Sequence, residues 1–188
     1  MKTLKRKRQH EQNEDHRIYL DCNATTPLEK SVATKISNSL TALWANPSSS
    51  YKIGQRARHE IETARQHVAD LIHCSDKSEI IFMSGGTEAN NHVFHIAVEY
   101  FNEGEFSGLN QQEHIKPHII STTIEHDSVL HVVKYLEQKG VIDLSLVEVN
   151  KELGCICADD VIACIRENTV MVSVMMANNE TGIIQVRI

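Results

Sequence analysis

Long hydrophobic runs are missing from this sequence of 188 residues, and their absence excludes whole classes of protein. The longest apolar run suited to a strand covers residues 170–177, far short of the roughly 20 apolar residues that a membrane-spanning helix needs. The basic residues near the start are not followed by an apolar stretch of about 7–15 residues, which a secretory signal requires. We therefore expect neither a membrane span nor a secretory signal, and no membrane partner.

Cysteines are few and scattered, which argues against a disulfide framework. The sequence has five, an odd number, as is typical of reduced thiols in the cytosol. Cys155 and Cys157 form the closest pair, but no second pair of Cys or His residues stands at zinc-finger spacing from them. We therefore predict a cytosolic protein without a metal site.

Positive charge is concentrated at the start of the chain and is scarce elsewhere. Residues 1–17 hold six basic and three acidic side chains, so they carry +3 of a net charge of −6 and the remainder carries −9. An acidic body repels a phosphate backbone, so we expect no nucleic-acid partner. The basic run at residues 5–8 indicates either a nuclear import signal or a solvated tail. We predict a disordered basic tail over residues 1–17 and one folded domain over residues 18–188.

Helical spacing comes first in the domain, and alternating strands and helices follow. Residues 18–20 suggest a short extended piece, and apolar spacing predicts helices over residues 32–43 and 57–71, with Pro47 between them. Residues 102–116 are expected to form a surface loop. Strands are expected at 79–84, 118–122, 144–149 and 169–176, and helices at 87–101, 126–138 and 158–167. This alternation predicts an α/β fold with three layers, a mostly parallel sheet flanked by helices.

Polar residues directly follow three of the predicted strands. They occupy residues 85–88 (Gly-Gly-Thr-Glu), 124–127 (Ile-Glu-His-Asp) and 178–182 (Asn-Asn-Glu-Thr-Gly). Ligands of open α/β sheets bind beyond the carboxyl ends of the strands, so these segments are the places to look for a site. If the sheet is parallel, the three segments lie along one of its edges.

Each segment has a chemical interpretation and a structural alternative. Gly86 and Thr87 begin a helix, where free N–H groups favour a phosphate, although a glycine turn with Thr87 as N-cap explains the pattern equally well. His126 can stack on a planar ligand or transfer a proton, or it simply faces solvent at a helix start. Asn179 can bond a ligand, or it belongs to an ordinary Asn-rich turn. Together the three predict a site for a flat, phosphorylated cofactor.

Five segments carry a resemblance to a known family. Residues 18–188 resemble the amino-terminal part of the class V, fold-type I pyridoxal-phosphate enzymes, in the cysteine desulfurase and selenocysteine lyase group. Residues 125–128 (Glu-His-Asp-Ser) and 176–182 (Met-Ala-Asn-Asn-Glu-Thr-Gly) are most similar to the animal selenocysteine lyases of that group. The segments that match in family order are residues 18–27 (Ile-Tyr-Leu-Asp-Cys-Asn-Ala-Thr-Thr-Pro), 46–49 (Asn-Pro-Ser-Ser), 84–91 (Ser-Gly-Gly-Thr-Glu-Ala-Asn-Asn), 125–128 and 177–182 (Ala-Asn-Asn-Glu-Thr-Gly).

The resemblance implies a cofactor and a role for each candidate residue. The cofactor is pyridoxal 5'-phosphate, with Gly86 and Thr87 at its phosphate, His126 stacked on its ring and active in catalysis, and Asn179 near the ring hydroxyl. The implied reaction cleaves L-selenocysteine to L-alanine and reduced selenium. The alternative substrate is cysteine, in an enzyme that supplies sulfur. The implied full-length form is a homodimer.

One residue that the family uses has no counterpart here. Such enzymes bind the cofactor covalently through a lysine that usually follows a histidine, but no histidine here precedes a lysine and no lysine follows Lys151. The chain would then be part of the large domain of such an enzyme, and we expect little or no turnover from residues 1–188. A competing interpretation of another class is a non-catalytic module that dimerises with a full-length relative.

Overall fold

The computed structural model describes residues 18–104 and 115–185. The predicted tail over residues 1–17, with its basic run, lies outside the described residues, as does most of the predicted loop at 102–116. The chain divides between Ala42 and Leu43 into two compact units, each of which is described by itself. The proposed domain boundary after residue 17 stays a prediction.

The described part of the first unit contains one helix and the segment that leads to it. Helix α1 (Lys30–Ala42) confirms the helix predicted from apolar spacing. The segment before it turns at residues 22–24, where the Tyr19 hydroxyl donates to the carbonyl oxygen of Asp21 at 2.6 Å. Hydrogen bonds from Ser31 lower the pKa of the Glu29 carboxyl just before the helix, so this side chain is ionised near its positive end.

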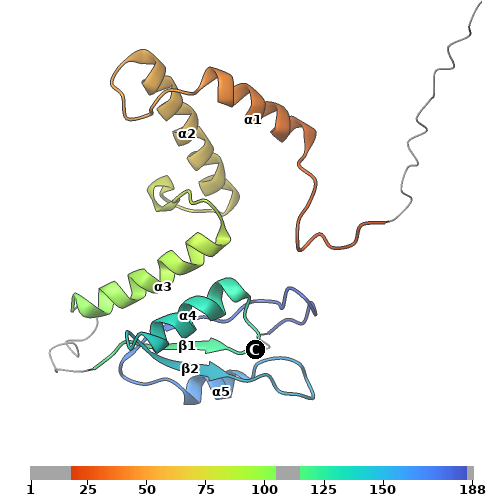
Figure 1. Cartoon of the computed structure of the whole chain (residues 1–188), viewed down its shortest axis with the longest axis vertical. Coiled ribbons are helices and arrows are strands. Elements are labelled where there is room, and N and C mark those ends of the chain that lie inside the picture. Colours follow the sequence, from red (N-terminus) through yellow and green to blue (C-terminus); the bar gives the residue numbers. More distant parts are fainter. Residues whose placement is uncertain (1–17, 105–114, 186–188) are drawn as a thin grey trace, which may run out of the picture. The chain divides into compact units, whose positions relative to one another are not determined.

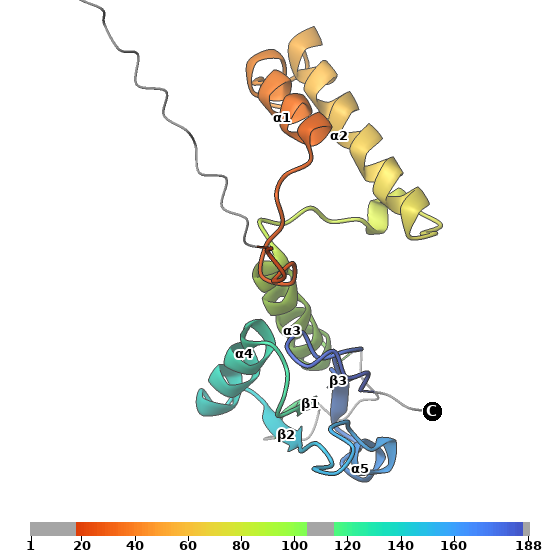
Figure 2. The ribbon, with the colours of Figure 1, turned by 90° about the vertical axis from the view of Figure 1, so that its right-hand side faces the viewer.

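The second unit begins with helices and continues as a sheet with helices on both faces. Helices α2 (Lys52–Leu71) and α3 (Gly86–Asn102) lie on either side of a short 3-10 helix, η1 (Lys77–Glu79). The strands are β1 (His118–Thr122), β2 (Asp143–Val147) and β3 (Thr169–Val172). Helix α4 (Asp127–Gln138) connects β1 to β2, and α5 (Ala158–Ala163) connects β2 to β3. Figures 1 and 2 show α4 and α5 on opposite sides of the strands.

The described sheet is parallel throughout, with β1 in the centre of the order β2-β1-β3. All five residues of β1 are buried, and successive side chains of a strand point to opposite faces. Ile119 therefore packs into the cluster formed with α3 and α4, whereas Ile120 packs with Val147 and Ile156 on the side of α5. The predicted three-layer α/β fold is confirmed.

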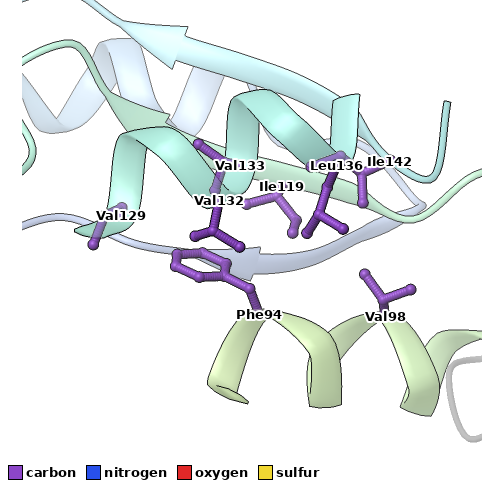
Figure 3. Packing of buried hydrophobic residues seen from close by; sticks show 8 residues of the cluster. All are labelled: Phe94, Val98, Ile119, Val129, Val132, Val133, Leu136 and Ile142. Atoms are coloured by element: carbon purple, nitrogen blue, oxygen red, sulfur yellow. The ribbon is translucent and has the colours of Figure 1, made fainter. Parts of the chain in front are cut away.

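The larger core joins α3 and α4 to the sheet. Figure 3 shows Phe94 and Val98 of α3 pointing toward Val132 and its neighbours on α4, with Ile119 of β1 beside them. Phe94 is 1% exposed. Because these side chains interlock, the starts of α3 and α4 are held on one rigid support.

His118 links the three strands through its side chain. Its Nδ1 lies 2.8 Å from Thr169 Oγ1 on β3, and its Nε2 lies 2.9 Å from Ser145 Oγ on β2. The ring is fully buried. Burial lowers the pKa of His118, and the positive charge of Arg166 lowers it further, against an opposing effect of Asp143. The ring is therefore neutral at neutral pH.

The strand predicted at residues 79–84 does not form. Residues 80–84 follow η1 without regular structure, and Ile81 and Phe82 are 64% and 50% exposed. A strand needs a neighbour to share its backbone hydrogen bonds, and the three described strands do not include this segment. These residues are apolar, as is typical of a strand, but they do not pair with any of the three described strands.

Three other elements end earlier than predicted. Strand β2 ends at Val147 rather than at 149. Strand β3 ends at Val172 rather than at 176, and its pairing with β1 ends there, opposite Ile120. Helix α5 ends at Ala163 rather than at 167. In the described ranges, no helix is both long and apolar enough to cross a membrane.

Candidate functional site

Helix α3 begins without a side-chain cap. Its N-cap residue is Gly85, and the first helical hydrogen bond runs from Ala89 N–H to the Gly85 carbonyl at 3.1 Å. The N–H groups of the first turn of a helix have no partner inside it, and the helix dipole makes this end attractive to an anion. Thr87 stands at the second helical position, so the alternative in which it serves as N-cap is wrong.

The glycines at this helix start leave space rather than make a tight turn. Neither Gly85 nor Gly86 has a φ in the left-handed region that favours glycine, and Gly85 is extended with φ 170°, so another residue could adopt its backbone. A Cβ atom added at either position would meet nothing within 4 Å. The helix start is therefore open to a ligand, and the glycine turn of the structural alternative is not formed here.

Glu88 is the acidic residue in the first turn of helix α3. Its carboxylate accepts a hydrogen bond from Ser84 N–H at 2.6 Å. The hydrogen bonds to Ser84 lower the pKa of Glu88, so the group is ionised at neutral pH. Because the carboxylate is hydrogen-bonded to the backbone of Ser84, before the helix, its repulsion of an anion at the first turn is limited.

His126 caps helix α4. The predicted helix over residues 126–138 is confirmed with a start at Asp127, and the His126 side chain accepts the capping hydrogen bond. Its Nδ1 lies 3.0 Å from Ser128 N and 2.8 Å from Ser128 Oγ. The exposed imidazole is therefore anchored through Nδ1, and Nε2 is the ring nitrogen that this anchor leaves for a ligand.

A side-chain hydrogen bond joins the starts of α3 and α4. Asn90 Nδ2 donates to Ser128 Oγ at 2.8 Å. The structure thereby brings together Thr87 and His126, two of the residues predicted from the sequence, in a cleft of about 520 Å³. A volume of this size is typical of a small-molecule site. The cleft is lined by Thr87, Asn91, His126, Asp127, Ser128, His131, Val132 and Tyr135.

Asn178 and Asn179 have different environments. The Asn178 side chain builds its own turn, because Oδ1 accepts from the N–H groups of Glu180 at 3.0 Å and Thr181 at 2.9 Å. Gly182 ends the turn with φ 72°, a conformation that favours glycine. Asn179 is exposed and does not line the cleft of Thr87 and His126.

Two hydrogen bonds hold the asparagine turn beside the segment of His126. Asn178 Nδ2 donates to the carbonyl oxygen of Ile124 at 3.1 Å. The buried carboxylate of Glu125 accepts from Met175 N–H at 2.6 Å and from the Thr122 hydroxyl at 3.1 Å. The turn with Asn179 therefore starts from the same sheet edge as His126, although Asn179 lies outside the cleft.

Sequence reasoning missed the residues that connect the site. Asn90, Ser128, Glu125 and Asn178 lie within the quoted motifs, but no role was assigned to them. In the sequence, only their position near the candidate residues points to them. Residue spacing does not reveal a hydrogen bond between two elements. In the described ranges, no group of three His, Cys, Asp or Glu side chains could hold a metal ion.

Residues 18–186 match the family described as aminotransferase class-V. The chain belongs to this family. The aminotransferase class-V family and the solved relatives of the chain are enzymes that depend on pyridoxal phosphate.

Individual curated proteins match most of the length of this sequence. Selenocysteine lyase of Xenopus tropicalis is 44% identical over 170 residues, which are 90% of this chain and 39% of the relative. Selenocysteine lyase of Bos taurus is 40% identical over 177 residues, or 91% of this chain and 40% of the relative. The mitochondrial cysteine desulfurase of Candida maltosa is 40% identical over 169 residues, which are 89% of this chain and 32% of the relative. The chain spans at most about two fifths of these relatives.

A solved structure has the same fold as most of this chain. A NifS-like protein superposes with a TM-score of 0.78 at 34% identity, covering 90% of this chain and 43% of its own. The agreement supports the α/β arrangement that places Thr87 and His126 together.

The site fits the cofactor of the aminotransferase class-V family. The open, uncapped start of the 17-residue helix α3 suits a phosphate group, and the Thr87 hydroxyl adds a donor there. The imidazole of His126 offers a flat face in the same cleft. The residues present therefore fit a phosphorylated aromatic ring.

Proposed function

We propose that this chain is the cofactor-binding amino-terminal part of a pyridoxal-phosphate enzyme that cleaves selenocysteine to alanine and reduced selenium. The observation that carries the proposal is the common cleft of Thr87 and His126 at the starts of two helices. The identity with selenocysteine lyases supports the choice of reaction. The proposed activity is that of the whole protein, because the relatives are more than twice as long as the part of them that matches this chain.

The proposal gives each candidate residue a task. The first-turn N–H groups of α3, with Gly86 and the Thr87 hydroxyl, bind the phosphate. His126 packs its ring against the cofactor ring and holds a proton at Nε2, while Asn179 orients the ring hydroxyl from the neighbouring turn. When bound, pyridoxal phosphate supplies an electron sink for bond cleavage next to the amino group of the substrate.

Binding of the cofactor by the full chain tests the proposal. Pyridoxal 5'-phosphate and pyridoxal differ only in the phosphate, so equilibrium dialysis with both measures what the helix start contributes. Thr87→Val removes the hydroxyl with little change in size and should weaken phosphate-form binding about tenfold, which is the loss of one charge-assisted hydrogen bond. Pyridoxal binding should not change.

A matched control removes a threonine hydroxyl elsewhere. Thr34→Val in helix α1 deletes a hydroxyl that bonds the Lys30 carbonyl, within the first unit of the chain. It should leave the binding of both compounds unchanged. Equal affinity of the wild-type chain for pyridoxal and its phosphate would contradict the proposed phosphate site.

Cysteine is the second candidate substrate. Cysteine desulfurases match the chain at similar identity, and a structure described as SspA in complex with cysteine superposes with a TM-score of 0.74 at 32% identity, covering 89% of this chain and 44% of its own. Alanine release from selenocysteine and from cysteine by the whole protein separates the two proposals. A higher kcat/KM for cysteine would make the enzyme a desulfurase.

We also propose that residues 1–188 alone do not catalyse the cleavage of selenocysteine. They contain no lysine after Lys151 and none that follows a histidine, so the covalent link to the cofactor that the family uses has no donor here. Purified chain with added cofactor should release no more alanine from selenocysteine than cofactor alone. Release well above that background would contradict this proposal.

A non-catalytic module is the competing function, and exposed apolar side chains favour it. Ile36 and Leu40 on α1 are 47% and 74% exposed, and Ile81 and Phe82 are also exposed. Such surfaces can associate with a second copy or with a full-length relative. Light scattering after size-exclusion chromatography, with and without an intact selenocysteine lyase, distinguishes a homodimer, a mixed dimer and a monomer.

A further inference from the structure

The Nδ1 atom of His126 has two hydrogen-bond donors. The backbone N–H of Ser128 lies 3.0 Å from Nδ1, and a backbone N–H can only donate. The hydroxyl oxygen of Ser128 lies 2.8 Å from the same atom. Nδ1 therefore accepts, and in the neutral ring the proton sits on Nε2.

Asn90 sets the direction of the Ser128 hydroxyl. Its Nδ2 amide group donates to Ser128 Oγ at 2.8 Å, which occupies a lone pair of that oxygen. The proton of the hydroxyl is then directed to His126 Nδ1. The hydrogen bonds therefore run from Asn90 on α3 to Ser128 on α4 and on to the imidazole of His126. Both helices are held in place by the core around Phe94 and Val132.

We infer that Asn90 and Ser128 are positioning residues that hold His126 as its Nε2–H tautomer, so that the ring presents a hydrogen-bond donor to the ligand. The role toward a ligand rests on the proposed function, whereas the tautomer follows from the hydrogen bonds within the chain. A ring held in this way donates from Nε2 to an acceptor, such as a carboxylate or ring oxygen. In its neutral form it cannot take up a proton at Nε2.

Histidine-labelled chain gives a direct reading of the tautomer. Long-range proton–nitrogen correlation spectra distinguish a protonated from an unprotonated ring nitrogen by their ¹⁵N shifts. Above the pH range in which imidazoles are protonated, His126 of the wild-type chain should show an unprotonated Nδ1 and a protonated Nε2. The opposite assignment would overturn the inference without any variant.

Two variants test the roles of the positioning residues. Asn90→Asp keeps the size of the side chain but replaces the donor with an acceptor, which should turn the Ser128 hydroxyl away from Nδ1. Ser128→Ala removes the hydroxyl and keeps the backbone donor. In both, the two ¹⁵N shifts of His126 should move toward each other as tautomers mix, while Ser128→Thr should retain the wild-type shifts.

His131 on the same helix is the internal control. Its Nε2 lies 3.8 Å from Asp127 Oδ1, so its signals should be unchanged in every variant that folds. Unchanged His126 shifts in Asn90→Asp and Ser128→Ala would overturn the positioning roles. Failure of the chain to bind pyridoxal phosphate would refute the proposed function. It would not affect the tautomer of His126, which the ¹⁵N shifts test independently.

Discussion

His118 shows how one buried side chain makes stability depend on pH. Its pKa is lowered from 6.5 mainly by burial and also by Arg166, so the native state binds fewer protons at this ring than the unfolded state. Its contribution to stability is complete above pH 6.5 and is lost as the pH falls below this value. The free energy of unfolding, measured by urea denaturation, should therefore decrease between neutral and mildly acidic pH.

A histidine variant separates this effect from the other histidines of the chain. His118→Gln should make the dependence of the unfolding free energy on pH shallower, because the buried titrating group is gone. Equal pH profiles for His118→Gln and the wild type would show that His118 does not titrate in this range.

Glu125 connects the sheet edge to the turn that bears Asn179. Glu125→Ala leaves Met175 N–H and the Thr122 hydroxyl without their acceptor, so we expect the free energy of unfolding to fall by about 1–3 kcal/mol. Glu125→Gln keeps an oxygen acceptor and should lose less. Chemical denaturation of both variants measures the difference, and equal losses would mean that the acceptor oxygen is unimportant.

The candidate site could be predicted from the sequence only in part. Thr87 and His126 were found because polar residues that follow apolar segments mark a sheet edge, and the structure places them in one cleft. The bond between Asn90 and Ser128 joins residues 38 positions apart, and no local pattern predicts it. Asn179 follows the expected strand, but its position outside the cleft depends on the turn built by Asn178.

At the scale of elements, the packing of α3 against α4 decides whether the site exists. Phe94→Ala removes a fully buried ring from this contact and should lower the free energy of unfolding by about 3–5 kcal/mol. Val93→Ala, at the neighbouring half-exposed position, should change it by less than about 0.5 kcal/mol. Similar losses in the two variants, measured by urea denaturation, would contradict the described packing.

The elements themselves were predicted where the signal is local. Helices α3 and α4 and strand β1 have apolar patterns that reach the core, and their bounds agree with the prediction within one residue. The expected strand at residues 79–84 had an equally apolar pattern. It failed because strand formation depends on a pairing neighbour, which the composition of the segment itself does not specify.

At the scale of the whole molecule, a bound cofactor should stabilise the folded chain. A ligand that binds only the folded state adds about 2.7 kcal/mol when its concentration is a hundred times the Kd. Pyridoxal 5'-phosphate should therefore raise the Tm of the wild-type chain, and pyridoxal should raise it less. Differential scanning fluorimetry measures both, and an equal effect of the two compounds would argue against a phosphate site.

The central claim is that the starts of α3 and α4 bind a phosphorylated ring in one cleft. Titration of isotopically labelled chain with pyridoxal 5'-phosphate, followed by backbone amide NMR, tests it most directly. The amide signals of Gly86, Thr87 and His126 should shift together and saturate, and pyridoxal should shift those of Gly86 and Thr87 much less. Saturable shifts confined to other regions, or equal shifts with pyridoxal, would contradict the claim.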